Sequence, residues 1–236
     1  MKRTISKKAK LCVLCLCLLL GLTACSANVE KKYQTYIKSL IAINYLGATQ
    51  DYMNASGANQ EDADALYDAN IQLLTDNLLT YYSVNIKDAP DMRVSFEELS
   101  KTIYSKVNYN VSKARKDGSV YLVDVTIYPI DLFNQTAPEV DTYINTFNDK
   151  VAAGDYNDYT LTEYETEFAT GLVEILTKGC ESMTYAKPET VTVEIIEDGD
   201  KFYISDRHFL MIDKAMISST VELPEATNTD AASATE

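Results

Sequence analysis

Apolar residues recur at every third or fourth position over much of the chain, which is the pattern of helices with one buried face. A well-placed asparagine precedes each of the first two helices, so Asn28 and Asn59 are their predicted N-caps, and Gly47 is expected to end the first. The pattern predicts helices over residues 29–46, 60–82, 95–103, 136–154, 162–183 and 206–217.

Three of these helix starts are predicted from a serine or threonine followed three residues later by glutamate. In such a capping box the two side chains satisfy each other's backbone amides. The pairs are Ser95 with Glu98, Thr136 with Glu139, and Thr162 with Glu165.

The hydrophobic period changes to two in two places, and each time an Asp-Gly pair interrupts it. Asp117-Gly118 separates 107–111 from 121–127, and Asp198-Gly199 separates 191–195 from 202–204. Alternating segments joined by Asp-Gly predict β-hairpins. Pro129 is expected to end the first hairpin.

The order helix, helix, hairpin occurs twice, so the sequence predicts an α+β fold of two αα-ββ units in tandem, at 29–131 and 132–217. Tyr36-Ile37 recurs as Tyr143-Ile144 at an offset of 107 residues, which favours an internal duplication. The alternative is a single cystatin- or NTF2-like sheet wrapped by helices. Residues 218–236 carry four acids and no base, and we expect them to form a disordered acidic tail.

The N-terminus has the three parts of a secretory signal peptide. Basic residues precede an apolar run over Leu11–Leu20, and small residues follow it. The run is about ten residues long, whereas a spanning helix needs about 20. We therefore interpret residues 1–24 as a cleaved signal peptide.

The residues at the predicted cut, Leu22-Thr23-Ala24-Cys25, resemble the lipobox of bacterial lipoproteins. This resemblance implies that Cys25 is diacylated, for example with palmitate, and becomes the first mature residue. Residues 25–28 would form a short lipidated tether, and the domain would lie on the extracytoplasmic face of the cell membrane.

Longer stretches resemble a group of uncharacterised small lipoproteins of Gram-positive, clostridia-type bacteria. The resemblance implies an envelope location and an α+β domain, and Cys25 is the one functional residue that it brings. It is carried by Tyr45-Leu46-Gly47 with Tyr52, by 103–111, by 151–156 and by 191–194 before a Phe/Tyr-Ile-Ser-Asp turn.

Charge excludes one class of partner. The chain has 21 bases and 35 acids, and the signal peptide removes five of the bases and none of the acids. The mature net charge of −19 would repel nucleic acid.

Few residues suit catalysis or metal binding. His208 is the only histidine, and Cys180 is the only cysteine beyond Cys25. A catalytic triad, a zinc site or an internal disulfide would need more such groups. We expect Cys180 to be a buried, inert thiol and His208 an exposed residue at a helix start, and we predict no metal and no cofactor.

Acidic residues offer weaker candidates. Asp124, Asp131 and Glu194 lie in or beside the predicted strands, where two carboxylates could serve a hydrolase of glycan or peptidoglycan. Asp155-Tyr-Asn157-Asp158-Tyr159 and Asp198-Gly-Asp200 group oxygen ligands but lack the spacing of a calcium loop. The 17 tyrosines could line a sugar or peptide groove, although most fall on predicted buried faces.

Together these features predict a membrane-anchored extracytoplasmic lipoprotein that acts as a non-enzymatic binding or scaffolding module at the cell envelope. Its expected partners are the membrane, through the lipid, and a glycan, a peptide or an envelope protein. The alternatives are an envelope hydrolase with paired carboxylates and an accessory subunit of an envelope complex.

Overall fold

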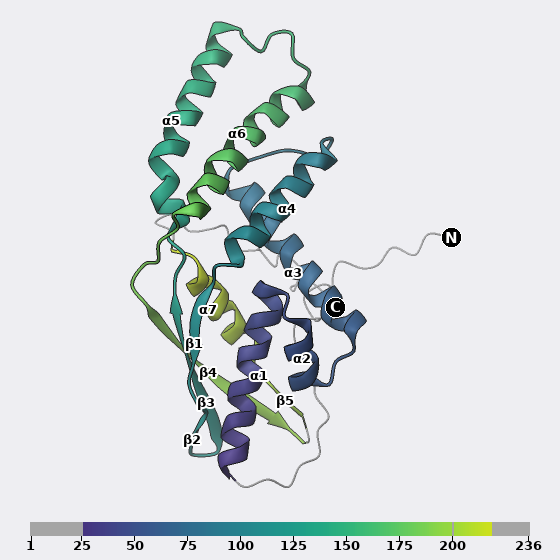
Figure 1. The fold of residues 1–236 in the computed structure, drawn as a ribbon, viewed down its shortest axis with the longest axis vertical. Coiled ribbons are helices and arrows are strands. Elements are labelled where there is room, and N and C mark those ends of the chain that lie inside the picture. Colours follow the sequence, from purple (N-terminus) through teal and green to yellow (C-terminus); the bar gives the residue numbers. More distant parts are fainter. Residues whose placement is uncertain (1–25, 200, 219–236) are drawn as a thin grey trace, which may run out of the picture.

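The computed structural model describes residues 26–199 and 201–218 (Figure 1). The predicted signal peptide, Cys25 and the predicted tail from residue 219 onward lie outside these residues. The helices are α1 (Ser26–Leu46), α2 (Thr49–Ser56), α3 (Gln60–Tyr81), α4 (Pro90–Tyr104), α5 (Leu132–Ala153), α6 (Leu161–Glu181) and α7 (Asp206–Met216). The strands are β1 (Asn108–Val111), β2 (Arg115–Asp117), β3 (Val120–Tyr128), β4 (Glu189–Asp198) and β5 (Lys201–Tyr203).

The strands form one curled antiparallel sheet in the order β1-β3-β4-β5, with β2 also paired to β3. The two predicted hairpins join because β3 pairs with β4 along most of its length, from Tyr121 opposite Ile195 to Ile127 opposite Glu189. The α+β class is thus confirmed, with both hairpins in a single sheet, as in the alternative arrangement.

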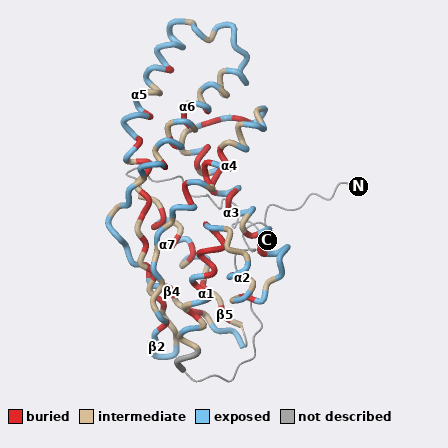
Figure 2. Tube along the Cα trace, in the orientation of Figure 1, coloured by how far each residue is buried: buried red, intermediate tan, exposed pale blue. Residues whose placement is uncertain are grey.

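The alternation of the two central strands decides which face of the sheet is covered. Val123 and Val125 of β3 and Val193 of β4 are buried, whereas Asp124 and Thr192 point to the other, polar face. Helices α1 and α7 contact β3 and cover the apolar face (Figure 1). The buried residues continue from this sheet up through the middle of the molecule (Figure 2).

Two helical layers continue from the sheet. Helices α3 and α4 contact each other and α1, and α4 in turn contacts α6. Helices α5 and α6 form an antiparallel hairpin that projects from the body at the end opposite the start of α1 (Figure 1). We call residues 132–181 the arm.

A glycine allows the two helices of the arm to approach closely. A Cβ atom on Gly171 of α6 would lie within 3.0 Å of the ring of Tyr143 on α5. The Tyr143 hydroxyl donates to the backbone carbonyls of Glu167 and Phe168, at 3.1 and 3.0 Å. Tyr143 therefore occupies the space that a side chain at 171 would need.

The three predicted capping boxes are wrong in position. Helix α4 begins at Pro90, and the Ser95 hydroxyl bonds back to the Asp91 carbonyl inside it. Helix α5 begins at Leu132, and Thr136 likewise bonds to the Leu132 carbonyl. A Ser or Thr hydroxyl in mid-helix commonly bonds one turn back, so the same spacing arises without a helix start.

A capping box does start α6, two residues before the predicted one. The Thr160 hydroxyl accepts from the Glu163 amide, and the Glu163 carboxylate accepts from the Thr160 amide. The backbone bond and the hydroxyl bond from Thr160 lower the pKa of Glu163. The predicted pair, Thr162 with Glu165, lies two residues further along the chain, inside the helix.

Other boundaries agree with the sequence. Asn59 accepts from the Asp62 amide at the start of α3, as predicted, and Gly47 lies at φ +64° directly after α1. Helix α1 itself begins at Ser26, so Asn28 is not its N-cap and the tether residues after Cys25 are helical. The short helix α2 was not predicted.

The proposed repeat pairs residues with different surroundings. The ring of Tyr36 packs on Phe202 of β5 in the body, while Tyr143 packs inside the arm. The duplication stays a prediction.

Candidate functional site

Only two of the three candidate carboxylates, Asp124 and Glu194, are neighbours on the sheet. Asp124 accepts a bond from the Thr192 hydroxyl at 2.7 Å and forms an ion pair with Arg115 at 2.6 Å. The Thr192 bond, followed by the Arg115 bond, lowers the pKa of Asp124. A general acid needs the opposite shift, so Asp124 is a structural partner on the polar face.

The other two carboxylates are separated from each other along the sheet. Glu194 lies opposite Leu122, diagonal to Asp124 on the same face. Asp131 lies seven residues beyond Asp124 along an extended chain, roughly 20 Å away, where it accepts a bond from Asn134 at 2.7 Å. Asp131 is therefore too distant to pair with the other two, and of those two Asp124 is already held by Arg115 and Thr192.

The surroundings of His208 and Cys180 indicate structural roles for both residues. The His208 ring accepts the backbone N–H of Glu194 at 3.4 Å, beside the edge of β4, and is half-buried rather than exposed. Cys180 is buried, and burial raises the pKa of its thiol to about 11. At that pKa the thiol is almost wholly protonated at neutral pH, as expected for an inert cysteine.

As far as they are described, the predicted oxygen-rich loops do not collect metal ligands. Residues 155–159 form successive turns between α5 and α6, and Asp200 lies outside the described residues. Within residues 26–199 and 201–218, no three His, Cys, Asp or Glu side chains group as a metal site would require.

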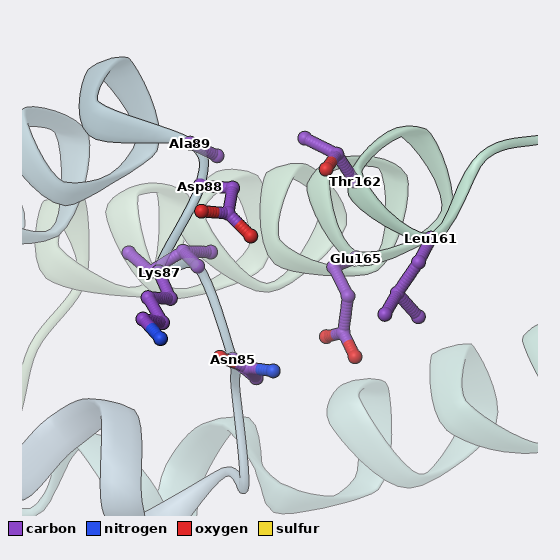
Figure 3. A pocket seen from close by; sticks show the side chains of 8 residues that line it. Asn85, Lys87, Asp88, Ala89, Leu161, Thr162 and Glu165 are labelled. Carbon is purple, nitrogen blue, oxygen red and sulfur yellow. The ribbon is translucent and has the colours of Figure 1, made fainter.

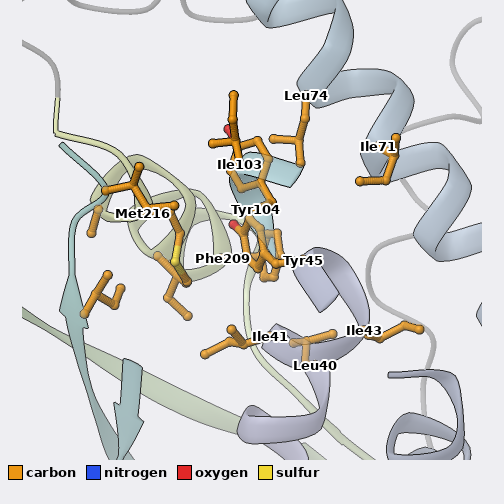
Figure 4. Packing of buried hydrophobic residues seen from close by; sticks show 14 of the residues in the cluster. Leu40, Ile41, Ile43, Tyr45, Ile71, Leu74, Ile103, Tyr104, Phe209 and Met216 are labelled. Carbon is orange, nitrogen blue, oxygen red and sulfur yellow. The ribbon is translucent and has the colours of Figure 1, made fainter. Parts of the chain in front are cut away.

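A polar pair that the sequence analysis missed joins α1 to α7 beside α4. Figure 4 shows two rings of this region, Tyr45 and Tyr104, among the packed apolar side chains. The hydroxyl of buried Tyr45 donates to the Asp213 carboxylate at 2.6 Å, and the Tyr104 ring stacks on Tyr45 with centroids 5.6 Å apart. Burial raises the pKa of Asp213, and the Tyr45 bond opposes part of this effect. Tyr45 and Asp213 are 168 residues apart in sequence, so no local sequence pattern predicts their contact.

Two small hollows open at the junction of the arm and the body. One lies between residues 85–89 and the first turns of α6, and is lined by Asp88, Leu161 and Glu165 among others (Figure 3). The second is mainly apolar and lies between α3, α4 and the start of α5, with Tyr104 and Phe133 in its wall. Neither brings together a nucleophile and a base.

The tip of the arm holds a cluster of aromatic rings. Phe147 is buried at its centre and lies 4.8–5.9 Å, centroid to centroid, from four other rings. Tyr156 extends the cluster outward to Tyr159, whose ring centroid is 5.1 Å away. The rings around Phe147 are Tyr143, Tyr156, Tyr164 and Phe168.

Apolar side chains also reach the surface at this tip. Val151 is 41% exposed, Tyr159 45% and Leu161 70%. We call residues 147–168, with these three side chains and the ring cluster beneath them, the arm tip. Val151 follows Phe147 at the helical spacing of four residues, which predicts a buried position, whereas no such pattern points to Leu161.

None of the helices in the described part of the chain has the length and apolar character needed to cross a membrane.

Comparisons with known proteins bear on the fold. No protein-family model and no curated protein matches the chain. The structure is similar to the crystal structure of a Bacillus subtilis protein described as a "putative lipoprotein", with a TM-score of 0.59 and 14% sequence identity. The match covers 82% of this chain and 58% of the neighbour, so the chain spans less than two thirds of that protein. At this identity the likeness shows a shared fold.

Proposed function

We propose that the protein is a lipid-anchored lipoprotein of the bacterial cell envelope, which acts as a non-enzymatic binding or scaffolding module. The observation that carries the proposal is Leu22-Thr23-Ala24-Cys25, placed directly after an apolar signal run and directly before α1. The fold shared with the Bacillus subtilis neighbour is consistent with it.

The fold also supports a lipid as the anchor. Two acyl chains hold a protein stably at a membrane without a spanning helix. Helix α1 begins one residue after Cys25 and is packed into the core through Ile37 and Ile41. An anchor at Cys25 would thus be joined to the core by continuous helix.

The arrangement of side chains favours binding over catalysis. Asp124 is neutralised by Arg115, Asp131 lies apart from it, and the His208 ring accepts a backbone N–H. Three exposed apolar side chains, Val151, Tyr159 and Leu161, lie at the arm tip. The end of the arm is opposite the start of α1 (Figure 1).

Replacement of the predicted lipidated cysteine tests this function. In a Gram-positive host, Cys25→Ser should abolish incorporation of labelled palmitate and move the protein from the membrane fraction to the medium. Cys180→Ser is the matched control, because Cys180 is the only other cysteine outside the signal peptide and is buried.

Mass spectrometry of the membrane fraction should find a diacylated Cys25 as the first mature residue. If the Cys25→Ser protein stays on the membrane, or if the mature chain begins elsewhere without lipid, the proposed anchor is wrong.

A further inference from the structure

The arm tip combines exposed apolar side chains with unneutralised negative charge. Residues 147–168 contain six acids and one base, Lys150, a net charge of −5. No ion pair between described residues involves any of these acids. Away from the tip, in contrast, Asp76, Glu97, Asp124 and Glu139 each have an arginine or lysine partner.

The aromatic rings lie among these carboxylates. Burial raises the pKa of Tyr156, and the nearby charges of Glu167 and Asp155 add to this effect. A ring face bordered by carboxylates attracts a cation through two effects, the quadrupole of the ring and the negative charge of the carboxylates. The Tyr159 ring, exposed and in edge contact with Tyr156, is the most accessible such face.

The arm tip is preorganised for contact. Phe147 and the rings around it hold the α5–α6 turn from below, and the Thr160–Glu163 capping box fixes the first turn of α6. A partner would therefore lose little binding energy in ordering this surface. The α5–α6 turn lies at the end of the arm (Figure 1), while Leu161 and Glu165 border residues 85–89 of the body.

We infer that the arm tip is a docking surface for a lysine- and arginine-rich segment of another envelope protein. Basic side chains of that segment would pair with Asp155, Asp158 and Glu167, while its apolar part would cover Tyr159 and Leu161. Charge complementarity selects this occupant, since a second copy of this acidic chain would be repelled. The inference names a partner class for the binding role proposed above, and so rests on it.

Titration with a lysine-rich synthetic peptide tests the surface directly. The probe is a fluorescent peptide that carries lysines and one leucine, and it is added to the full chain in non-ionic detergent. Asp155→Asn/Asp158→Asn/Glu167→Gln should weaken binding about tenfold. These residues are exposed, and none of the three belongs to the capping box.

The matched control removes the same number of charges from another surface. Glu61→Gln/Asp64→Asn/Asp68→Asn changes exposed residues of α3 and leaves the tip intact. It should alter peptide affinity by less than about twofold. If the two triple variants weaken binding equally, or the wild type does not bind the peptide, the attraction is diffuse and the inference is overturned.

The apolar part of the surface needs its own variant. Leu161→Ser removes the most exposed apolar side chain of the tip without changing charge. It should weaken binding of the leucine-containing peptide and leave binding of an all-lysine, leucine-free peptide unchanged. An equal effect on both peptides, or no effect on either, contradicts an apolar contact.

Photo-crosslinking in cells then identifies the occupant. A photoreactive residue at Asn157 in the tip should crosslink to an envelope protein through a lysine- or arginine-rich peptide, whereas one at Ser119 in the distant β2–β3 turn should not. Crosslinks from position 157 only to glycan or to a second copy of this chain would overturn the inference. The peptide titration requires no lipid, so failure of the anchor and failure of the docking surface are distinguishable.

Discussion

At the scale of single residues, the Tyr45–Asp213 pair is the most unusual chemistry in the described chain. A carboxylate placed beside two tyrosines and an apolar core loses solvation, and its charged form becomes less favourable. The Tyr45 hydroxyl compensates in part. The pair joins the C-terminal helix α7 to α1.

This pair predicts a specific pH dependence of stability. The pKa of Asp213 is raised above its ordinary value of 3.8, so the folded state holds the proton more tightly than the unfolded state. The resulting stabilisation is complete below that ordinary value and is lost as pH rises through the raised pKa. Asp213→Asn keeps an acceptor for Tyr45 and should remove this loss of stability at higher pH. The variant should be at least as stable as the wild type at about pH 7.

Urea unfolding between about pH 2.5 and pH 8 measures the effect. Asp124→Asn is the control with the opposite sign, because the pKa of Asp124 is lowered and its contribution is lost as pH falls. If Asp213→Asn destabilises the protein at neutral pH and leaves the pH profile unchanged, the carboxylate does not carry the proposed burial cost.

At the scale of elements, the strands could be predicted better than the helix starts. Asp-Gly turns need a positive φ, which Gly118 and Gly199 adopt, at 59° and 62°, so the turn chemistry is local and visible in sequence. Helix starts depend on which of several similar hydroxyls meets a free amide. The spacing of Thr162 and Glu165 is as good as that of Thr160 and Glu163, and only the path of the chain selects the second pair.

The candidate sites could not be predicted for a related reason. Whether Leu161 is buried depends on how far the arm projects, and the meeting of Tyr45 with Asp213 depends on the packing of α7 against α1. Both are tertiary facts, and periodicity assigns an inward face without saying what covers it.

A substitution at Gly171 tests the packing of α5 against α6, because helix propensity and the contact with Tyr143 would change the stability in opposite directions. Gly→Ala in a helix normally stabilises by about 1 kcal/mol. At Gly171 the added methyl group would instead strike the Tyr143 ring, so we expect Gly171→Ala to destabilise the protein by about 1–3 kcal/mol. Thermal or urea unfolding measures the difference.

Thr177→Ala is the control for this variant, since Thr177 is an exposed residue of the same helix. It should be neutral or slightly stabilising. A Gly171→Ala protein that is more stable than the wild type would show that α5 and α6 are not packed as described.

At the scale of the whole molecule, the two ends of the longest axis carry different features. Helix α1 starts beside β1 and β2, where the Glu30 carbonyl accepts the Ala114 amide, and the arm tip lies at the other end (Figure 1). Helices α1 and α5 are each about 30 Å long. With Cys25 in the bilayer, the acidic tip would lie well away from anionic headgroups.

Two labelled variants test this orientation. A fluorophore attached at Ser119→Cys, in the β2–β3 turn, should be quenched by spin-labelled lipids in vesicles that hold the lipidated protein. The same fluorophore at Asn157→Cys should not be. The native Cys180 reacts slowly because it is buried, and the wild-type chain measures its background. Equal quenching at both sites would mean that the molecule lies flat on the membrane.

The helical start of α1 also bears on how such a protein could be shed from a cell. A surface protease cuts an extended segment, and α1 runs from Ser26, the residue after the proposed anchor Cys25, straight into the core. If Cys25 is acylated as proposed, no slack chain separates the acyl group from the fold, and release by proteolysis would first require α1 to unwind from the sheet. Retention at the cell surface is then tied to the folding stability of the domain itself.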